Sequence, residues 1–100
     1  MLIIRGVNLY PSEVERVLLT VGDIGPHYQL VVERPRTLDE LTVVCEPATP
    51  GAQPTADLQA RAERALREAT GLGIRVDLRP TGSVPRSEGK AVRVLDRRPR

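Results

Sequence analysis

The sequence predicts an α+β two-layer sandwich, in which two helices cover one face of a small, mostly antiparallel sheet. Two segments with the periodicity of amphipathic helices alternate with short runs of Val, Ile and Leu. The chain has 100 residues, which is the size of one small domain. It contains two tyrosines and neither Phe nor Trp, so aliphatic side chains must build its core.

The first predicted elements are a strand and a helix. Residues 2–5 are a short apolar run that predicts a strand, and Gly6 follows it. Asn8 can tolerate an unusual backbone conformation or bond to its own backbone in a turn. A helix is predicted from about Pro11, a favoured first-turn residue, to Gly22, which stops it. Its apolar face carries Val14, Val17, Leu18 and Val21.

The middle of the chain predicts a hairpin. Residues 28–34 and 41–46 are both rich in β-forming side chains. The connection through Pro35-Arg36-Thr37 is short enough for the two strands to pair in antiparallel fashion. Residues 47–54 are rich in Pro, Gly, Ala and Thr, which predicts a loop.

The remaining elements are a second helix and two strands. The helix is expected to begin after Thr55, which can cap its N-terminus, and to end at Gly71. Apolar and charged residues alternate over residues 74–78, which predicts a half-buried strand, and residues 91–95 predict a short last strand. The order is therefore β-α-β-β-α-β plus one short strand, which is ferredoxin-like.

The composition argues against several classes of function. Few aromatic side chains are available to stack on the bases of single-stranded nucleic acid. Cys45 is the lone cysteine, so no intrachain disulfide forms, and one Cys with one His does not make a zinc site. We expect no metal site. The sequence has neither a signal peptide nor an apolar run long enough to span a membrane, so we expect a cytoplasmic protein without a membrane or nucleic-acid partner.

Catalytic chemistry is predicted in the loop Pro85-Arg86-Ser87-Glu88-Gly89-Lys90. Lys90 is the only lysine in the chain, against fourteen arginines. An ammonium is a compact charge on a flexible stem, suited to reaching a carboxylate or phosphate oxygen. Gly89 lets the backbone approach a ligand closely, and Pro85 stiffens the entry to the loop. The alternative is a solvated lysine in a turn.

Two stretches resemble motifs of the C-terminal domain of acyl-adenylate-forming enzymes. Residues 2–15 resemble the strand, Arg-Gly turn and helix that open this domain. Residues 85–90, together with Arg93, resemble the Gly-Lys loop near its end. The variant Arg-Gly-Val-Asn-Leu-Tyr-Pro-Ser, followed by Pro26-His27-Tyr28-Gln29, is most similar to the phenylacetate–CoA ligases. The resemblance covers essentially the whole chain.

The resemblance implies a ligase with ATP and CoA as co-substrates and with Mg²⁺ accompanying ATP. An aryl acid, phenylacetate by the sequence variant, is first joined to AMP and then transferred to CoA, and the domain rotates between the two steps. The resemblance makes Lys90 catalytic in the first step. The loop residues expected to support it are Pro85, Arg86, Ser87 and Gly89. The residues expected along the pantetheine arm of CoA in the second step are Arg5, Gly6, Val7 and Asn8.

The large N-terminal domain of such ligases, with the ATP and acid pockets, has no counterpart in residues 1–100. We therefore expect a single mobile lid domain that is inactive alone and has the large domain as its partner. The alternative is a free-standing ligand-binding or protein-interaction module, since fold alone does not decide function. A weaker alternative is nucleic-acid binding by the C-terminal arginines, although such tails are more often frayed and solvated. His27 and Ser87 lack a recognisable catalytic partner.

Overall fold

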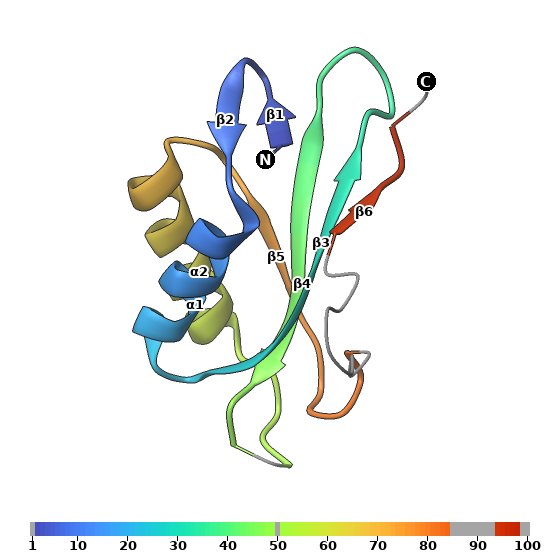
Figure 1. The fold of residues 1–100 in the computed structure, drawn as a ribbon. Helices are drawn as coiled ribbons and strands as arrows, with labels where there is room; N and C mark the ends of the chain where they lie inside the picture. Colours follow the sequence, from blue (N-terminus) through green and yellow to red (C-terminus); the bar gives the residue numbers. More distant parts are fainter. Residues whose placement is uncertain (1, 50, 85–93, 99–100) are drawn as a thin grey trace.

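The computed structural model describes residues 2–49, 51–84 and 94–98 of the chain. Two helices pack on one face of a four-stranded sheet, and a separate two-stranded hairpin lies at one end of the molecule (Figure 1). The elements in chain order are β1 (Leu2–Ile4), β2 (Val7–Leu9), α1 (Pro11–Val21), β3 (Ile24–Glu33), β4 (Glu40–Pro47), α2 (Ala56–Thr70), β5 (Arg75–Leu78) and β6 (Val94–Asp96).

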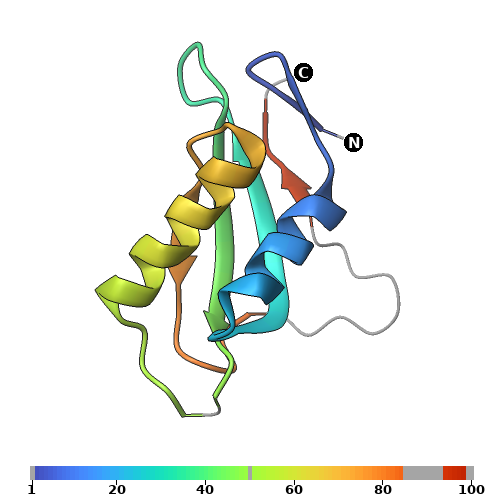
Figure 2. The ribbon, with the colours of Figure 1, turned by 90° about the vertical axis from the view of Figure 1, so that its left-hand side faces the viewer.

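The four-stranded sheet has the order β5-β4-β3-β6. Strands β3 and β4 are the predicted antiparallel hairpin, whereas β5 pairs with β4, and β6 with β3, in parallel. Both helices lie on the same face of this sheet (Figure 2). The predicted α+β two-layer class is confirmed, and the sheet itself is mixed.

The first strand differs from the expectation in its partner. It pairs with β2 rather than with the main sheet, and Ile3 lies opposite Asn8. Asn8, which could also have formed a turn, lies in a strand. The chain reverses earlier, at Arg5 and Gly6, whose φ angles of 51° and 78° are both positive. Two successive positive φ angles match the type I′ turn, whose twist suits a two-residue hairpin.

Helix α1 buries its predicted apolar face, and α2 buries an apolar face against the same core. The side chains of Val14 and Leu18 in α1 pack into one core with those of Ala62 and Leu66 in α2. The strand residues of the same core include Leu30, Val32, Val43, Cys45 and Val76. Neither helix in the described part of the chain has the length and hydrophobicity to cross a lipid bilayer.

The predicted ends of α2 are confirmed by its capping contacts. The Thr55 hydroxyl accepts a hydrogen bond from the backbone N–H of Leu58 at 3.1 Å, which satisfies one of the free amides of the first turn. At the other end Gly71 adopts the left-handed conformation, with φ 78°, and its N–H donates to the carbonyl of Arg67 at 2.8 Å.

Cys45 is a core residue of β4 with no exposed surface. Burial, with smaller contributions from the charges of Asp77 and Glu46, raises the pKa of its thiol to about 12. Since the thiolate is the reactive form, Cys45 behaves as the small buried apolar residue that its Val-rich surroundings predict.

Candidate functional site

The four residues predicted to face the pantetheine arm gather at the tip of the β1–β2 hairpin. Arg5, Gly6, Val7 and Asn8 are all exposed to solvent. No heavy atom beyond the chain neighbours would lie within 4 Å of a Cβ added at Gly6. The tip is therefore an open edge of the domain, which a ligand or a second domain can approach closely.

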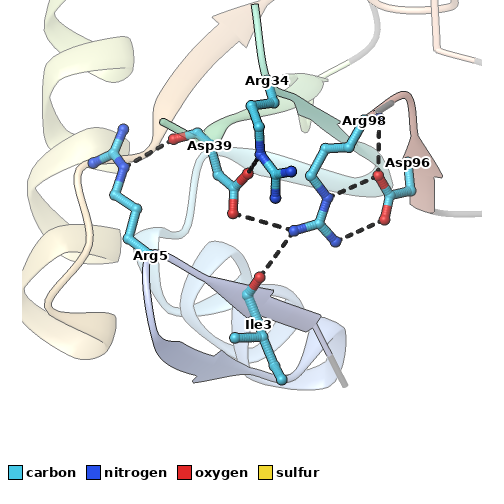
Figure 3. Close-up of polar contacts among 6 residues, drawn as sticks. All are labelled: Ile3, Arg5, Arg34, Asp39, Asp96 and Arg98. Carbon is cyan, nitrogen blue, oxygen red and sulfur yellow. Dashed lines mark hydrogen bonds and ion pairs between the residues drawn. The ribbon is translucent and has the colours of Figure 1, made fainter. Parts of the chain in front are cut away.

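Arg5 holds a backbone conformation that is unfavourable for its side chain. It is the only non-glycine residue with positive φ among residues 2–49, 51–84 and 94–98. For an L-residue this region costs roughly 1–2 kcal/mol. Its side-chain Nε donates a hydrogen bond of 2.8 Å to the backbone carbonyl of Asp39, in the connection between β3 and β4 (Figure 3). This contact ties the strained turn to the end of the main sheet.

The Asp39 carboxylate is the centre of an ionic cluster that the sequence analysis missed. Its side chain is 8% exposed and accepts from Arg34 Nε at 2.8 Å and from Arg98 Nη1 at 3.2 Å. The hydrogen bond from Arg34 and the charges of both guanidinium groups hold the pKa of Asp39 below its usual value, against the opposing effect of burial. The sequence does offer one indication of this cluster, because Asp39 is the only acidic residue in the connection that contains Arg34 and Arg36.

Arg98 joins this cluster to the hairpin and is not a frayed terminal residue. Its Nη1 also donates to the carbonyl of Ile3 in β1 at 2.9 Å (Figure 3). Its Nε and Nη2 contact the Asp96 carboxylate at 3.0 and 2.7 Å, and its backbone N–H donates to the same group. These contacts lower the pKa of Asp96 to about 2. The expectation of a solvated arginine tail is therefore corrected at Arg98.

The predicted catalytic loop lies outside the described residues. This holds for Lys90 and for Pro85, Arg86, Ser87 and Gly89. The residues that lead into the loop are described, and a buried carboxylate binds them. Glu46, 2% exposed at the end of β4, accepts hydrogen bonds from the backbone N–H groups of Gly82 and Val84 at 2.9 and 3.2 Å. Sequence analysis missed this role of Glu46 because the partners are backbone groups.

The hairpin tip and the entry to the predicted catalytic loop lie at opposite ends of the main sheet. Glu33 pairs with Glu40 at one end of the β3–β4 ladder, and Ile24 pairs with Pro47 at the other. The contact between Arg5 and Asp39 places the hairpin tip at the first end. The contacts of Glu46 place Gly82 and Val84 at the second end, as both ribbon views agree (Figures 1 and 2).

The described surface has one hollow beside the hairpin tip and a larger one over the main sheet. One of about 130 Å³ is lined by Arg5, Glu40, Leu41, Thr42, Gly73 and Arg75. Another of about 520 Å³ lies over the sheet and has Val31, Val44, Asp77 and Arg79 among its lining residues. The hollow beside Arg5 is smaller than pockets that enclose a ligand, which are roughly 300–1,000 Å³. A ligand at the hairpin tip would therefore need a second surface to enclose it.

Neither a metal centre nor a catalytic histidine emerges from the described residues. No group of three or more His, Cys, Asp or Glu side chains is arranged there to hold a metal ion. His27 lies in β3, beside the register shift between Ile24 and Tyr28, and is half-buried.

The family model of the AMP-binding enzyme C-terminal domain matches residues 6–98. The chain belongs to this family. The AMP-binding enzyme C-terminal domain described here is 43% identical to part of the phenylacetate-coenzyme A ligase of Thermus thermophilus, over 98% of the domain and 26% of that protein. It is 40% identical to part of the corresponding Escherichia coli ligase, over 98% of the domain and 23% of that protein. The domain spans about a quarter of the length of these curated relatives.

Solved structures agree with the family assignment. A domain of phenylacetate-coenzyme A ligase from Bacteroides vulgatus superposes with a TM-score of 0.84 at 33% identity, covering 99% of this domain and 93% of that chain. A 2-hydroxyisobutyryl-CoA ligase in complex with 2-HIB-AMP and CoA superposes with a TM-score of 0.83 at 30% identity, covering 95% of this domain and 20% of that chain. The resemblance inferred from the two motifs is confirmed.

Proposed function

We propose that this domain is the mobile C-terminal lid of an AMP-forming, aryl-acid CoA ligase whose acid is phenylacetate. The observation that carries the proposal is the exposed Arg5–Gly6 turn, at the start of a domain that four phenylacetate-coenzyme A ligases match over 98–100% of its length. The proposed partner is a large N-terminal domain, which supplies the ATP and acid pockets. The lid by itself would then be inactive.

In the first proposed step, a carboxylate oxygen of the acid attacks the α-phosphorus of ATP. The bond between the α-phosphorus and the bridging oxygen breaks, pyrophosphate leaves, and an acyl-adenylate remains. Lys90 would act as an electrostatic clamp, aligning the two anionic reactants and stabilising the charge that gathers between them. Mg²⁺ would arrive with ATP, and no step is assigned to it through residues of this domain.

In the second proposed step, the thiol sulfur of CoA attacks the acyl carbon of the adenylate. The acyl C–O bond breaks, AMP leaves as the phosphate anion, and the thiol proton passes to solvent. The Arg5–Gly6 turn would line the pantetheine arm from the side of this domain. Gly6 supports this role, because its open surroundings allow backbone to pass close to a narrow chain.

The opposite placement of the hairpin tip and of the entry to the predicted catalytic loop supports domain rotation between the steps. The Arg5 side chain donates a hydrogen bond to Asp39, in the connection between β3 and β4, whereas the backbone N–H of Val84 donates to Glu46 at the other end of the sheet. A rigid domain of this shape cannot present both ends to one small reaction centre at once. Rotation would allow one cleft to serve both reactions in turn.

The experiment joins this chain to the large domain of the Thermus thermophilus relative, in place of that enzyme's own C-terminal quarter. With ATP, CoA and phenylacetate we expect equal amounts of phenylacetyl-CoA, AMP and pyrophosphate, whereas the yields from benzoate and acetate report the choice of acid made by the large domain, which holds the acid pocket. The 100-residue chain alone is the matched control and should form no thioester. Lack of acyl-CoA from every acid would overturn the ligase proposal, and thioester formation by the chain alone would overturn its dependence on a large domain.

A further inference from the structure

The Arg5–Gly6 turn has little packing to fix its position. All four residues from Arg5 to Asn8 are exposed, and a Cβ at Gly6 would touch nothing within 4 Å. An isolated two-stranded hairpin is only marginally stable in water. Leu9 anchors the base of this hairpin in the core, and Ile4 of the closing pair is buried there too, but the core holds none of the residues from Arg5 to Asn8. Polar contacts are therefore what fixes the turn residues themselves.

Two such contacts reach the hairpin, and Asp39 takes part in both. The Asp39 backbone carbonyl accepts from the Arg5 side chain, inside the turn itself. The Asp39 carboxylate binds Arg98, whose same Nη1 atom donates to the carbonyl of Ile3. Figure 3 shows these contacts converging on the hairpin from the β3–β4 connection and from the residues after β6. The turn is thus held through Arg5 itself and through β1, the strand that leads into it.

The register of the hairpin explains why the Ile3 carbonyl is available. Ile4 pairs with Val7 across the two-residue turn, and Ile3 pairs with Asn8 one position further on. Hydrogen-bonded and non-bonded pairs alternate along an antiparallel ladder, so a pair next to the closing one directs its carbonyls outward. Arg98 occupies this free edge of β1.

The guanidinium of Arg98 is itself held in place before it meets the hairpin. The Asp96 carboxylate accepts hydrogen bonds from its Nε and Nη2 atoms. Its Nη1 atom donates to the Ile3 carbonyl and to the Asp39 carboxylate. The Arg98 side chain is 18% exposed and the Asp39 side chain 8%, so solvent has limited access to the contact between them. Arg34 binds the second oxygen of Asp39 and completes the set of partners that a buried carboxylate requires.

We propose that Asp39 and Arg98 are positioning residues that hold the Arg5–Gly6 turn in the orientation needed for the CoA step, an inference that rests on the proposed function. Neither residue touches the reacting atoms. Their effect is expected in the second half-reaction, because misplacement of a positioning element by about 1 Å can cost on the order of 100-fold in rate. The adenylation half-reaction is assigned to Lys90 in the proposed function, and not to this turn.

The first test is Asp39→Asn in the fused ligase described above. Asparagine has nearly the same shape, but its amide nitrogen must face one of the two guanidinium groups, which weakens the clamp. We expect about tenfold slower transfer from preformed acyl-adenylate to CoA, with a raised KM for CoA. Pyrophosphate exchange should change less than about twofold. Equal losses of rate in both half-reactions would show that Asp39 has only a structural role and would overturn the proposal.

Asp23→Asn is the control variant. Asp23 also forms a long-range ion pair, with Arg61 at 2.8 Å, but it lies at the end of the sheet away from the hairpin. It should leave both half-reactions unchanged. If Asp39→Asn does not fold, Arg98→Lys is the variant to test. Lysine keeps the positive charge, but its single ammonium group cannot bind Asp96 and the Ile3 carbonyl together, as the planar guanidinium group does. The same selective loss is expected, and an unaltered CoA step would count against the proposal.

A second readout separates this inference from the ligase proposal. Amide hydrogen exchange by NMR in the 100-residue chain measures how often the hairpin opens at Val7. We expect at least about tenfold faster exchange at Val7 in Asp39→Asn, with the amides of α2 unchanged. Unchanged exchange at Val7 would overturn the positioning role even if the ligase is active. In a chain without ligase activity, this comparison alone decides whether Asp39 holds the turn.

Discussion

The Glu46 carboxylate accepts a hydrogen bond from the backbone N–H of Gly82 at 2.9 Å, although 36 positions separate the two residues in sequence. The same oxygen accepts from the N–H of Val84, which is 2% exposed. A carboxylate buried at the end of β4 thus binds the last described residues before the predicted catalytic loop. Charge-assisted hydrogen bonds of this kind are the stronger ones in proteins.

Glu46→Gln should loosen the entry to the predicted catalytic loop. The amide keeps the size and one oxygen but loses the charge, and we expect the free energy of unfolding to fall by about 1–2 kcal/mol. Hydrogen exchange at Gly82 and Val84 should accelerate at least about tenfold. Urea unfolding and NMR exchange measure the two effects.

Glu63→Gln is the matched control for Glu46→Gln. The Glu63 carboxylate also accepts from a backbone N–H, that of Val76 in β5, at 3.0 Å. Replacement of Glu63 should accelerate amide hydrogen exchange at Val76 and leave the exchange rates at Gly82 and Val84 unchanged. Faster exchange at Gly82 in both variants would show a general loss of stability rather than a local role of Glu46.

Arg5→Asn should separate the stability of the turn from its function. Asn-Gly is a favoured type I′ pair, so relief of the backbone strain offsets the lost bond to Asp39. We expect the free energy of unfolding to stay within about 1 kcal/mol of the parent. Thioester formation in the fused ligase should nevertheless slow about tenfold, if the arginine side chain acts in the CoA step.

Arg36→Asn provides the control for the removal of one positive charge. Arg36 is exposed and makes no hydrogen bond or ion pair within the ranges that the structure describes. It should change neither stability nor either half-reaction. A comparable loss of thioester formation in this variant would attribute the effect of Arg5→Asn to net charge alone.

Gly6→Ala tests whether another surface approaches the turn. The added Cβ meets nothing in the domain, so only the positive φ is costly, by roughly 1–2 kcal/mol. Gly51→Ala shares the φ of 78° and the open surroundings and is the control. Thermal unfolding should respond equally to both changes, whereas thioester formation should fall with Gly6→Ala only. Equal activity in both variants would refute close contact at Gly6.

Lys90→Ala in the fused ligase should suppress adenylation far more than transfer from preformed acyl-adenylate. An electrostatic contact made only in one transition state is worth on the order of 100-fold or more. Lys90→Arg should recover little, because the planar guanidinium does not reproduce a point charge. Pyrophosphate exchange and single-turnover transfer measure the two steps, and equal losses in both would contradict the proposed role.

The ionic cluster should make acid stability depend on Asp96. The pKa of Asp96 is lowered from 3.8 to about 2 by Arg98, so its contribution is present above about pH 4 and is lost as pH falls towards about 2. Asp96→Asn removes this dependence. The melting temperature of the parent should therefore drop more steeply than that of the variant across this interval. Parallel profiles would exclude a stabilising contact between Asp96 and Arg98 in solution.

Sequence patterns were sufficient for the helices and the central hairpin. Their information is local: Pro11 begins α1, Thr55 caps α2, and Gly71 ends it in the left-handed conformation. The pairing of the first strand was not predictable in the same way. Any apolar strand can add to the main sheet, and only the turn geometry at Arg5, a residue seldom found with positive φ, diverts it into a hairpin.

Local patterns were enough to predict the α+β class and both helices, and the Arg5–Gly6 and Gly-Lys motifs were enough to predict the family. The contacts that hold the Arg5–Gly6 turn, and the binding of the lead-in to the other loop by Glu46, became visible in the folded domain alone. The difference lies in the sequence separation of the interacting residues. Helix periodicity and capping act within a few residues, whereas Asp39 and Arg98 meet across 59 positions, and no local pattern encodes that contact.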